Sequence, residues 1–212
     1  MSKTLYLWDM AGTLYPQKWN DGLTGTKSFD EWIEKQLGKK IDEVSPRKYE
    51  EMYEVPYTKG IYFNLSVQPD YQKVLSWTKR NEAFTTGLSQ TNDWRATYLN
   101  PLVGYDIRDY LQKINLTFDY AETNVKTEEM LINYLTGKFK EGYQTIVYTD
   151  DNLKNCESFC KAVKLVQKNY PKFSCRIYHI KNNQSGINDK KWYYEIGSLT
   201  DLMNNEKRLK KI

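Results

Sequence analysis

Continuously apolar runs alternate with amphipathic runs along this chain. The run LYLW at residues 5–8 is apolar at every position, which is typical of a strand buried on both faces of a parallel sheet, and it ends at Asp9. Further extended segments are predicted at residues 116–121, 144–149 and 175–180, and helices at residues 127–140 and 152–169. Strands separated by helices of this length predict right-handed crossovers. We therefore predict an α/β fold with a doubly wound parallel sheet.

A different pattern follows the first strand. Ser28 and Glu31 form a capping box that opens an amphipathic helix, and Gly38 closes it. A second short helix is predicted to start at Ser45, with Pro46 at its first helical position. Two units are predicted: a core made of residues 1–14 and 70–212, and a helical insert made of residues 15–69.

The segment after the insert is predicted to return to the core. A helix is expected to open at Pro69, followed by a short strand at residues 82–85 and a turn at Thr86 and Gly87. A long amphipathic helix is expected at residues 94–113.

Composition limits the class of protein. The chain has 212 residues, of which 40% are hydrophobic and 15% aromatic, and its net charge is +4; this excludes a disordered chain. Its apolar runs are far shorter than the roughly 20 residues that cross a bilayer. The first residues lack the pattern of a secretory leader, so we expect a cytoplasmic protein with no membrane partner.

The positive charge is concentrated in the basic tail at residues 206–211, and elsewhere the two signs alternate. This predicts a solvated, partly frayed tail rather than an arm that binds nucleic acid. A single histidine, His179, argues against a catalytic triad and a zinc centre, and three cysteines are too few for a disulfide framework. Any chemistry must therefore rest on carboxylates.

Ligands of doubly wound sheets bind beyond the carboxyl ends of the strands. The residues expected there are Asp9, Thr85, Lys126, Asp150 and Asp151. Three carboxylates, a hydroxyl and an ammonium suit phosphoryl transfer: one carboxylate attacks phosphorus, the others hold Mg²⁺, and the remaining groups bind the phosphoryl oxygens. Taken alone, the triplet Asp150-Asp151-Asn152 also fits a helix N-cap.

Four motifs resemble those of the haloacid dehalogenase (HAD) superfamily of phosphohydrolases. They are LYLWDMAGTL at residues 5–14, FTTG at 84–87, Lys126, and IVYTDD at 146–151. They occur in the order of the family and span nearly the whole chain. The resemblance implies a HAD-like, Rossmannoid core, with residues 15–69 as a cap inserted after the first strand.

The resemblance also implies the roles of single residues. Asp9 would be the nucleophile that forms an aspartyl-phosphate on a small phosphorylated substrate. Mg²⁺ would be held by Asp9, the backbone carbonyl of Ala11 and Asp150, with Asp151 in support. Thr85 and Lys126 would orient the phosphoryl group, and Thr86 and Gly87 would complete the substrate-binding loop.

Ala11 departs from the pattern of most phosphatases of this family, which carry a second aspartate there. That aspartate protonates the leaving group, and such acid catalysis is worth about 10² to 10⁴ in rate. The substrate could carry a good leaving group, as a phosphoanhydride or an acyl phosphate does; the P-type ATPases of the family, with Thr at this position, are the analogy. Alternatively, the chain is a member with weakened or lost catalysis that is retained for binding.

Two other members of the family also lack this aspartate. Phosphonoacetaldehyde hydrolase has the same Asp-x-Ala-Gly-Thr motif and uses a cap lysine as a Schiff base, so cleavage of a carbon–phosphorus bond stays open, although no lysine of the insert stands out for that role. Dehalogenases usually carry Tyr there and need no metal. The adjacent Asp150 and Asp151 suit a metal site and so argue against a dehalogenase. The aromatic residues of the insert are expected to form its own small core, with stacking on a nucleotide as the alternative.

Overall fold

A computed structural model describes residues 3–9, 12–14, 18–19, 21–59, 61–63, 70–80, 84–90, 117–121, 127–181 and 184–209. In these ranges, seven strands form one sheet in the order β5-β4-β1-β6-β7-β9-β8. The strands are β1 (Lys3–Trp8), β4 (Phe84–Gln90), β5 (Thr117–Ala121), β6 (Tyr143–Asp150), β7 (Ser174–Ile180), β8 (Ile187–Asp189) and β9 (Tyr194–Ile196). All neighbours pair in parallel except β8 and β9, which are antiparallel.

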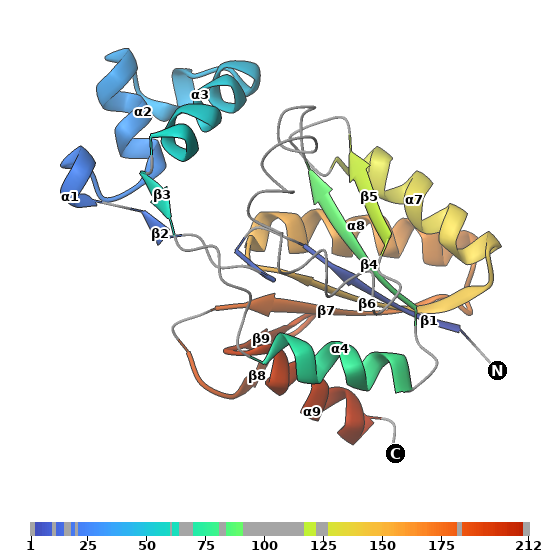
Figure 1. The fold of residues 1–212 in the computed structure, drawn as a ribbon. Coiled ribbons are helices and arrows are strands. Elements are labelled where there is room, and N and C mark those ends of the chain that lie inside the picture. Colours follow the sequence, from blue (N-terminus) through green and yellow to red (C-terminus); the bar gives the residue numbers. More distant parts are fainter. Residues whose placement is uncertain are drawn as a thin grey trace.

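Helices cover both faces of the sheet. They are α4 (Tyr71–Arg80), α7 (Glu128–Lys140), α8 (Leu153–Asn169) and α9 (Leu199–Leu209). Helices α7 and α8 pack together on one face, and α4 and α9 pack together on the other (Figure 1). The predicted doubly wound α/β fold is therefore confirmed. No helix in the described ranges is both long and apolar enough to cross a membrane.

Strand β1 lies inside the sheet, between β4 and β6, and its side chains are buried on both faces. Leu5 and Leu7 belong to the apolar core under α7 and α8. Tyr6 is also fully buried, and its ring lies 5.7 Å from that of Trp77 of α4. This burial on both sides explains why the first strand has no polar alternation.

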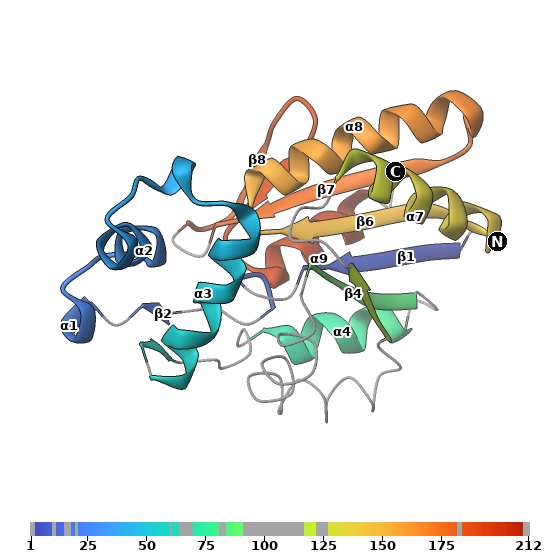
Figure 2. The ribbon, with the colours of Figure 1, turned by 90° about the horizontal axis from the view of Figure 1, so that it is seen from above.

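The insert contains β2 (Lys18–Trp19), α1 (Asp21–Thr24), α2 (Phe29–Leu37), the 3₁₀ helix η1 (Ile41–Glu43), α3 (Pro46–Thr58) and β3 (Tyr62–Phe63). The predicted cap of α2 is present, since the Glu31 amide donates to Ser28 Oγ at 3.2 Å and Gly38 has a φ of +62°. In both views, these elements lie on the side toward which β1, β6 and β7 point (Figures 1 and 2).

Aromatic side chains hold the helices of the insert together. Phe29 and Trp32 are buried with Ile33, and the Tyr49 ring lies 5.0 Å from that of Phe29. Trp19 packs against the same cluster. The expectation that these aromatic residues form a small core of their own is confirmed for those whose side chains are described.

One expectation about the core was wrong and another is not tested. Strand β4 runs from Phe84 to Gln90, so Thr86 and Gly87 lie within a strand and not in a turn. The reason is that β4 pairs with β1 on one side and with β5 on the other, and this pairing extends the strand beyond its apolar start. The helix expected at residues 94–113 lies outside the described residues.

The C-terminal segment is also more ordered than predicted. Helix α9 continues to Leu209, and Glu206 is fully buried rather than solvated. Its carboxylate accepts hydrogen bonds from Arg176 Nε at 2.6 Å and from the Tyr178 hydroxyl at 2.7 Å. These partners lie about 30 positions earlier in the sequence, so the local sequence does not reveal them. The many charges of the tail therefore led us to expect exposure.

Candidate active site

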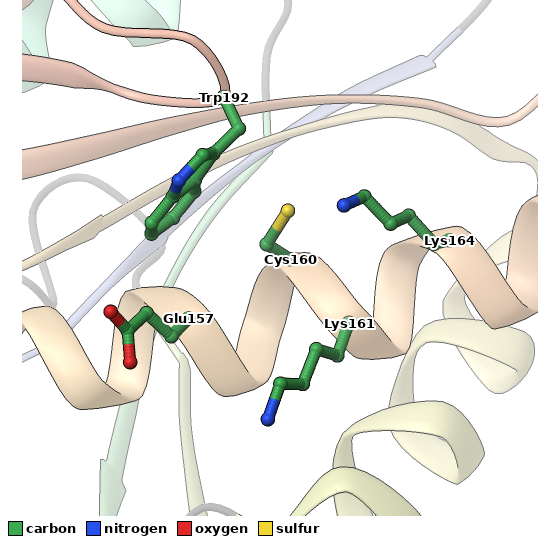
Figure 3. A pocket seen from close by; sticks show the side chains of 5 residues that line it. All are labelled: Glu157, Cys160, Lys161, Lys164 and Trp192. Atoms are coloured by element: carbon green, nitrogen blue, oxygen red, sulfur yellow. The ribbon is translucent and has the colours of Figure 1, made fainter.

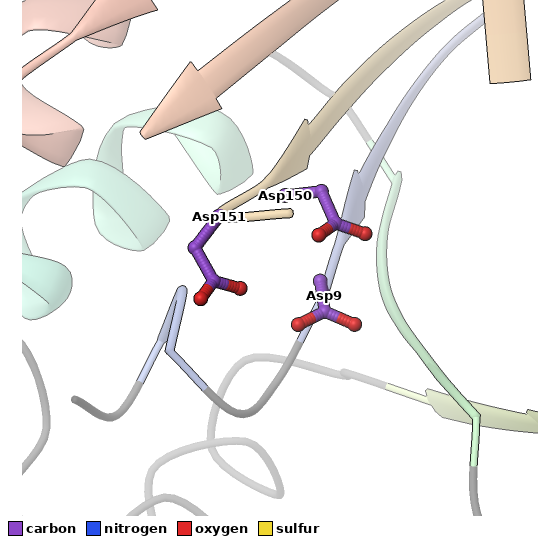
Figure 4. Close-up of side chains that lie close together, drawn as sticks. All are labelled: Asp9, Asp150 and Asp151. Carbon is purple, nitrogen blue, oxygen red and sulfur yellow. The ribbon is translucent and has the colours of Figure 1, made fainter. Parts of the chain in front are cut away.

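Three carboxylates meet at the carboxyl ends of β1 and β6. Asp9 directly follows β1, Asp150 is the last residue of β6, and Asp151 follows it. The Asp9 amide donates to the Thr149 carbonyl at 2.8 Å, which holds the two strand ends together. One carboxylate oxygen from each of the three aspartates lies within 4.8 Å of the others (Figure 4).

Hydrogen bonds fix the carboxylate of Asp150. The Tyr148 hydroxyl donates to Oδ2, the Asn152 amide donates to Oδ1 at 2.8 Å, and Asn155 Nδ2 donates to Oδ2 at 3.1 Å. Burial and the negative charge of Asp150 raise the pKa of Tyr148 well above its ordinary value, so this hydroxyl remains a donor. These donors hold both oxygens of the Asp150 carboxylate in place at the end of β6.

The N-cap of α8 is Asn152, whose side chain accepts a hydrogen bond from the Lys154 amide at 3.0 Å. The triplet Asp150-Asp151-Asn152 therefore does cap α8, through Asn152, and the N-cap interpretation is confirmed for that residue. The two aspartates lie before the cap, at the end of β6. Both carboxylates lie with that of Asp9 at the edge of the sheet.

The turn after Asp9 packs on Asp151. Thr13 Oγ1 donates to Asp151 Oδ1 at 3.4 Å. Gly12 has a φ of +84°, and a Cβ at this position would lie 2.1 Å from Asp151 Oδ2. Only glycine fits both the backbone conformation and the space. The turn and the carboxylate are thus built against each other.

The second predicted motif is placed by strand register. Thr85 pairs with Tyr6 and Gly87 pairs with Trp8, so Thr85 lies inside β4 and not at its carboxyl end. If this register is continued, Leu88 falls opposite Asp9, which follows Trp8, and Ser89 falls one position further along. The sequence offers no anchor for this register, so it does not reveal that Ser89 lies nearer the level of Asp9 than Thr85 does.

Other predicted site residues lie partly or wholly outside the described residues. Ala11 and Lys126 are not described, and Thr85, Thr86 and Gly87 are described by their backbone only. Their proposed roles stay predictions.

The donor set suits a hard divalent cation. Carboxylate oxygens are the ligands that Mg²⁺ prefers, and three neighbouring carboxylates repel one another unless a cation compensates their charge.

One described surface pocket is separate from this cluster. It has a volume of about 190 Å³ (Figure 3) and is lined by Glu157, Cys160, Lys161, Lys164 and Trp192.

Comparisons with protein-family models and with curated proteins give no match. Solved structures do match over nearly the whole chain. A putative β-phosphoglucomutase from Thermotoga maritima is 13% identical, with a TM-score of 0.56 over 97% of this chain and 99% of that one. A haloacid dehalogenase-like family hydrolase from Xanthomonas campestris is 9% identical, with a TM-score of 0.54 over 98% and 96%.

A HAD hydrolase of family IA, variant 3, from Entamoeba histolytica is 14% identical, with a TM-score of 0.53 over 95% of each chain. All three share the α/β architecture described above. Their sequence identities to this chain are so low that the likeness shows the fold alone. The chain therefore has the fold of the HAD-superfamily hydrolases.

Proposed function

We propose that this protein is a Mg²⁺-dependent phosphohydrolase that acts on a small phosphorylated substrate through an aspartyl-phosphate at Asp9. The observation that carries the proposal is the meeting of Asp9, Asp150 and Asp151 at the carboxyl ends of β1 and β6. The fold shared with HAD-superfamily hydrolases supports it.

In the proposed reaction, an oxygen of Asp9 attacks phosphorus, and the bond from phosphorus to the leaving group breaks. Water then attacks the aspartyl-phosphate, which releases phosphate and restores the Asp9 carboxylate. Asp9, the carbonyl of Ala11 and Asp150 would hold the cation, with Asp151 in support. When bound, Mg²⁺ neutralises negative charge on the carboxylates and on the phosphoryl oxygens.

The groups that hold the phosphoryl oxygens are proposed from sequence and register. Thr85, Thr86, Gly87 and Lys126 match the family's motifs. The register of β4 with β1 adds Ser89, because it is the hydroxyl residue of β4 that falls nearest the level of Asp9. A hydroxyl or ammonium placed there would stabilise charge that develops during transfer.

Ala11 restricts the proposed substrate. Without an acid two residues after Asp9, the leaving group must depart without that proton donor. A phosphoanhydride or acyl phosphate meets this need, because its leaving group is stable as an anion. Residues 15–69 are proposed as the cap, and their position on the side toward which β1, β6 and β7 point supports this role.

The test is an Asp9→Asn variant assayed with anhydride, acyl phosphate and monoester substrates, with and without Mg²⁺. Hydrolysis is expected to fall by about 10³-fold or more, because an amide is a poor nucleophile. The control is Asp189→Asn, since Asp189 is exposed on β8 and should leave the rate unchanged. Wild-type protein that binds Mg²⁺ but hydrolyses no substrate of the panel would indicate a binding protein instead.

A further inference from the structure

His179 connects the acidic cluster to the next strands of the sheet. It lies on β7 opposite Asp150, the last residue of β6, and it is 5% exposed. Its Nε2 lies 3.0 Å from the main-chain carbonyl oxygen of Asp151. A carbonyl oxygen can only accept, so Nε2 carries the hydrogen and donates.

Asp151 needs such a support because it belongs to no regular element. Strand β6 ends at Asp150 and helix α8 begins at Leu153. The carbonyl of Asp151 is held by His179, and its carboxylate accepts the hydrogen bond from Thr13. The imidazole therefore fixes the backbone from which this carboxylate projects.

The other side of the imidazole faces a carboxylate. His179 Nδ1 faces Glu195 Oε1 of β9 at 4.0 Å, and both side chains are 7% exposed. Lys181 Nζ lies 2.6 Å from Glu195 Oε1, and Lys190 Nζ lies 3.2 Å from Oε2. Two ammonium groups thus hold the Glu195 carboxylate beside the ring, while Nδ1 itself is buried without a hydrogen-bond partner among the described residues.

We propose that His179 is a positioning residue for the acidic cluster. By donating from Nε2 to the Asp151 carbonyl, it keeps the Asp151 carboxylate within reach of Asp9 and Asp150. The proposal rests on the proposed function, in which this cluster holds Mg²⁺. Partners that orient the residues around a metal typically contribute a factor of about 10 to 100 in metal affinity.

The experiment measures the Mg²⁺ dissociation constant of the full chain by calorimetry, without substrate. His179→Leu removes the donor at similar size, and it is expected to raise the dissociation constant about 10- to 100-fold. His179→Gln places an amide nitrogen near the position of Nε2, and it is expected to restore an affinity close to that of the wild type.

The matched control is Asn205→Leu, which removes another buried donor, the one that bonds to the Tyr178 hydroxyl at 3.0 Å. It should lower stability, measured by urea unfolding, and leave the Mg²⁺ affinity unchanged. If His179→Leu does not fold, the comparison of His179→Gln with His179→Asn decides, because the shorter amide reaches the position of Nδ1 instead. Gln should then bind Mg²⁺ tightly and Asn weakly.

The proposal is overturned if His179→Leu binds Mg²⁺ like the wild type, if the Leu and Gln variants lose the same affinity, or if Asn and Gln are equal. Wild-type protein that binds Mg²⁺ but hydrolyses nothing would overturn the proposed function alone, and the Mg²⁺ affinities would still decide the role of His179. Wild-type protein that binds no Mg²⁺ would overturn both.

Discussion

Gly12 and Asp151 lie so close together that a Cβ on residue 12 would be 2.1 Å from Asp151 Oδ2. Gly12→Ala should therefore do more than strain the backbone, because the new methyl group must displace the carboxylate. We expect a loss of stability above the roughly 1–2 kcal/mol cost of a left-handed residue, together with at least about tenfold weaker Mg²⁺ binding. Urea unfolding and calorimetry measure the two effects.

The control for this variant is Gly186→Ala. Gly186 has a φ of +80°, and a Cβ there would meet no atom within 4 Å. It should show the backbone cost alone, with Mg²⁺ affinity unchanged. Equal effects of the two alanines on Mg²⁺ affinity would refute the role of the close packing between Gly12 and Asp151.

Ser89 and Thr85 are competing candidates for the hydroxyl that the second motif contributes to the phosphoryl group. Because Thr85 pairs with Tyr6 inside the sheet while Ser89 lies past the level of Asp9, Ser89→Ala should reduce kcat/KM more than Thr85→Val. The loss of one hydrogen-bond donor to a reacting oxygen costs about 10² in rate. Steady-state kinetics on the best substrate of the panel distinguishes the two, and a larger loss with Thr85→Val would restore the original assignment.

Ala11→Asp tests the missing acid. An aspartate here should raise hydrolysis of phosphate monoesters by up to about 10² to 10⁴, because their leaving groups need a proton. Hydrolysis of anhydrides should hardly change. Ala11→Asn is the matched control, since it adds similar bulk without a carboxyl group; if it accelerates monoester hydrolysis equally, leaving-group protonation is not the missing factor.

Glu206 should be important for stability, although it is not part of the acidic cluster of Asp9, Asp150 and Asp151. Glu206→Gln leaves Arg176 without its ionic partner in a largely buried place, for which we expect a loss of about 3 kcal/mol. Glu128→Gln, in the exposed pair with Lys161, should cost less than about 1 kcal/mol. Urea unfolding measures both, and similar losses would contradict the importance of burial.

Alkaline pH should destabilise the fold. Burial, followed by the charge of Glu206, raises the pKa of Tyr6 and Tyr178 above the value of about 10 that they have in an unfolded chain. Above that pH the unfolded state releases protons that the folded state retains, so the free energy of unfolding falls as pH rises. Urea unfolding between about pH 8 and about pH 11 should show this fall, and Tyr6→Phe should reduce its slope. A flat profile would contradict it.

The parts of the fold that follow from local pattern were predictable. The run before Asp9 and the segment before Asp150 are apolar because both strands are buried in the middle of the sheet, and their order along the chain indicated the parallel pairing. The meeting of Asp9 and Asp150 then follows from the geometry of parallel strands.

Features that depend on distant partners were not predictable. Strand β4 continues to Gln90 because of its pairing with β1 and β5, and nothing local sets the register that brings Ser89 past the level of Asp9. The bond from His179 to Asp151 joins positions 28 residues apart. A contact between two single residues far apart in the sequence leaves no periodic pattern of hydrophobic and polar positions, so a single sequence does not reveal it.

The described apolar cluster of the insert, built on Phe29, Trp32, Ile33 and Ile61, shares no residue with the described core beneath α7 and α8. We therefore expect mutations that reshape one of these clusters to have little effect on the packing of the other. Evolution could exchange the insert for a longer, shorter or differently shaped one at little cost to the sheet, since the entropy of closing a loop grows slowly with its length. If the proposed function holds, the insert could change its shape, and with it the choice of substrate, while the strand ends that carry the aspartates stay the same.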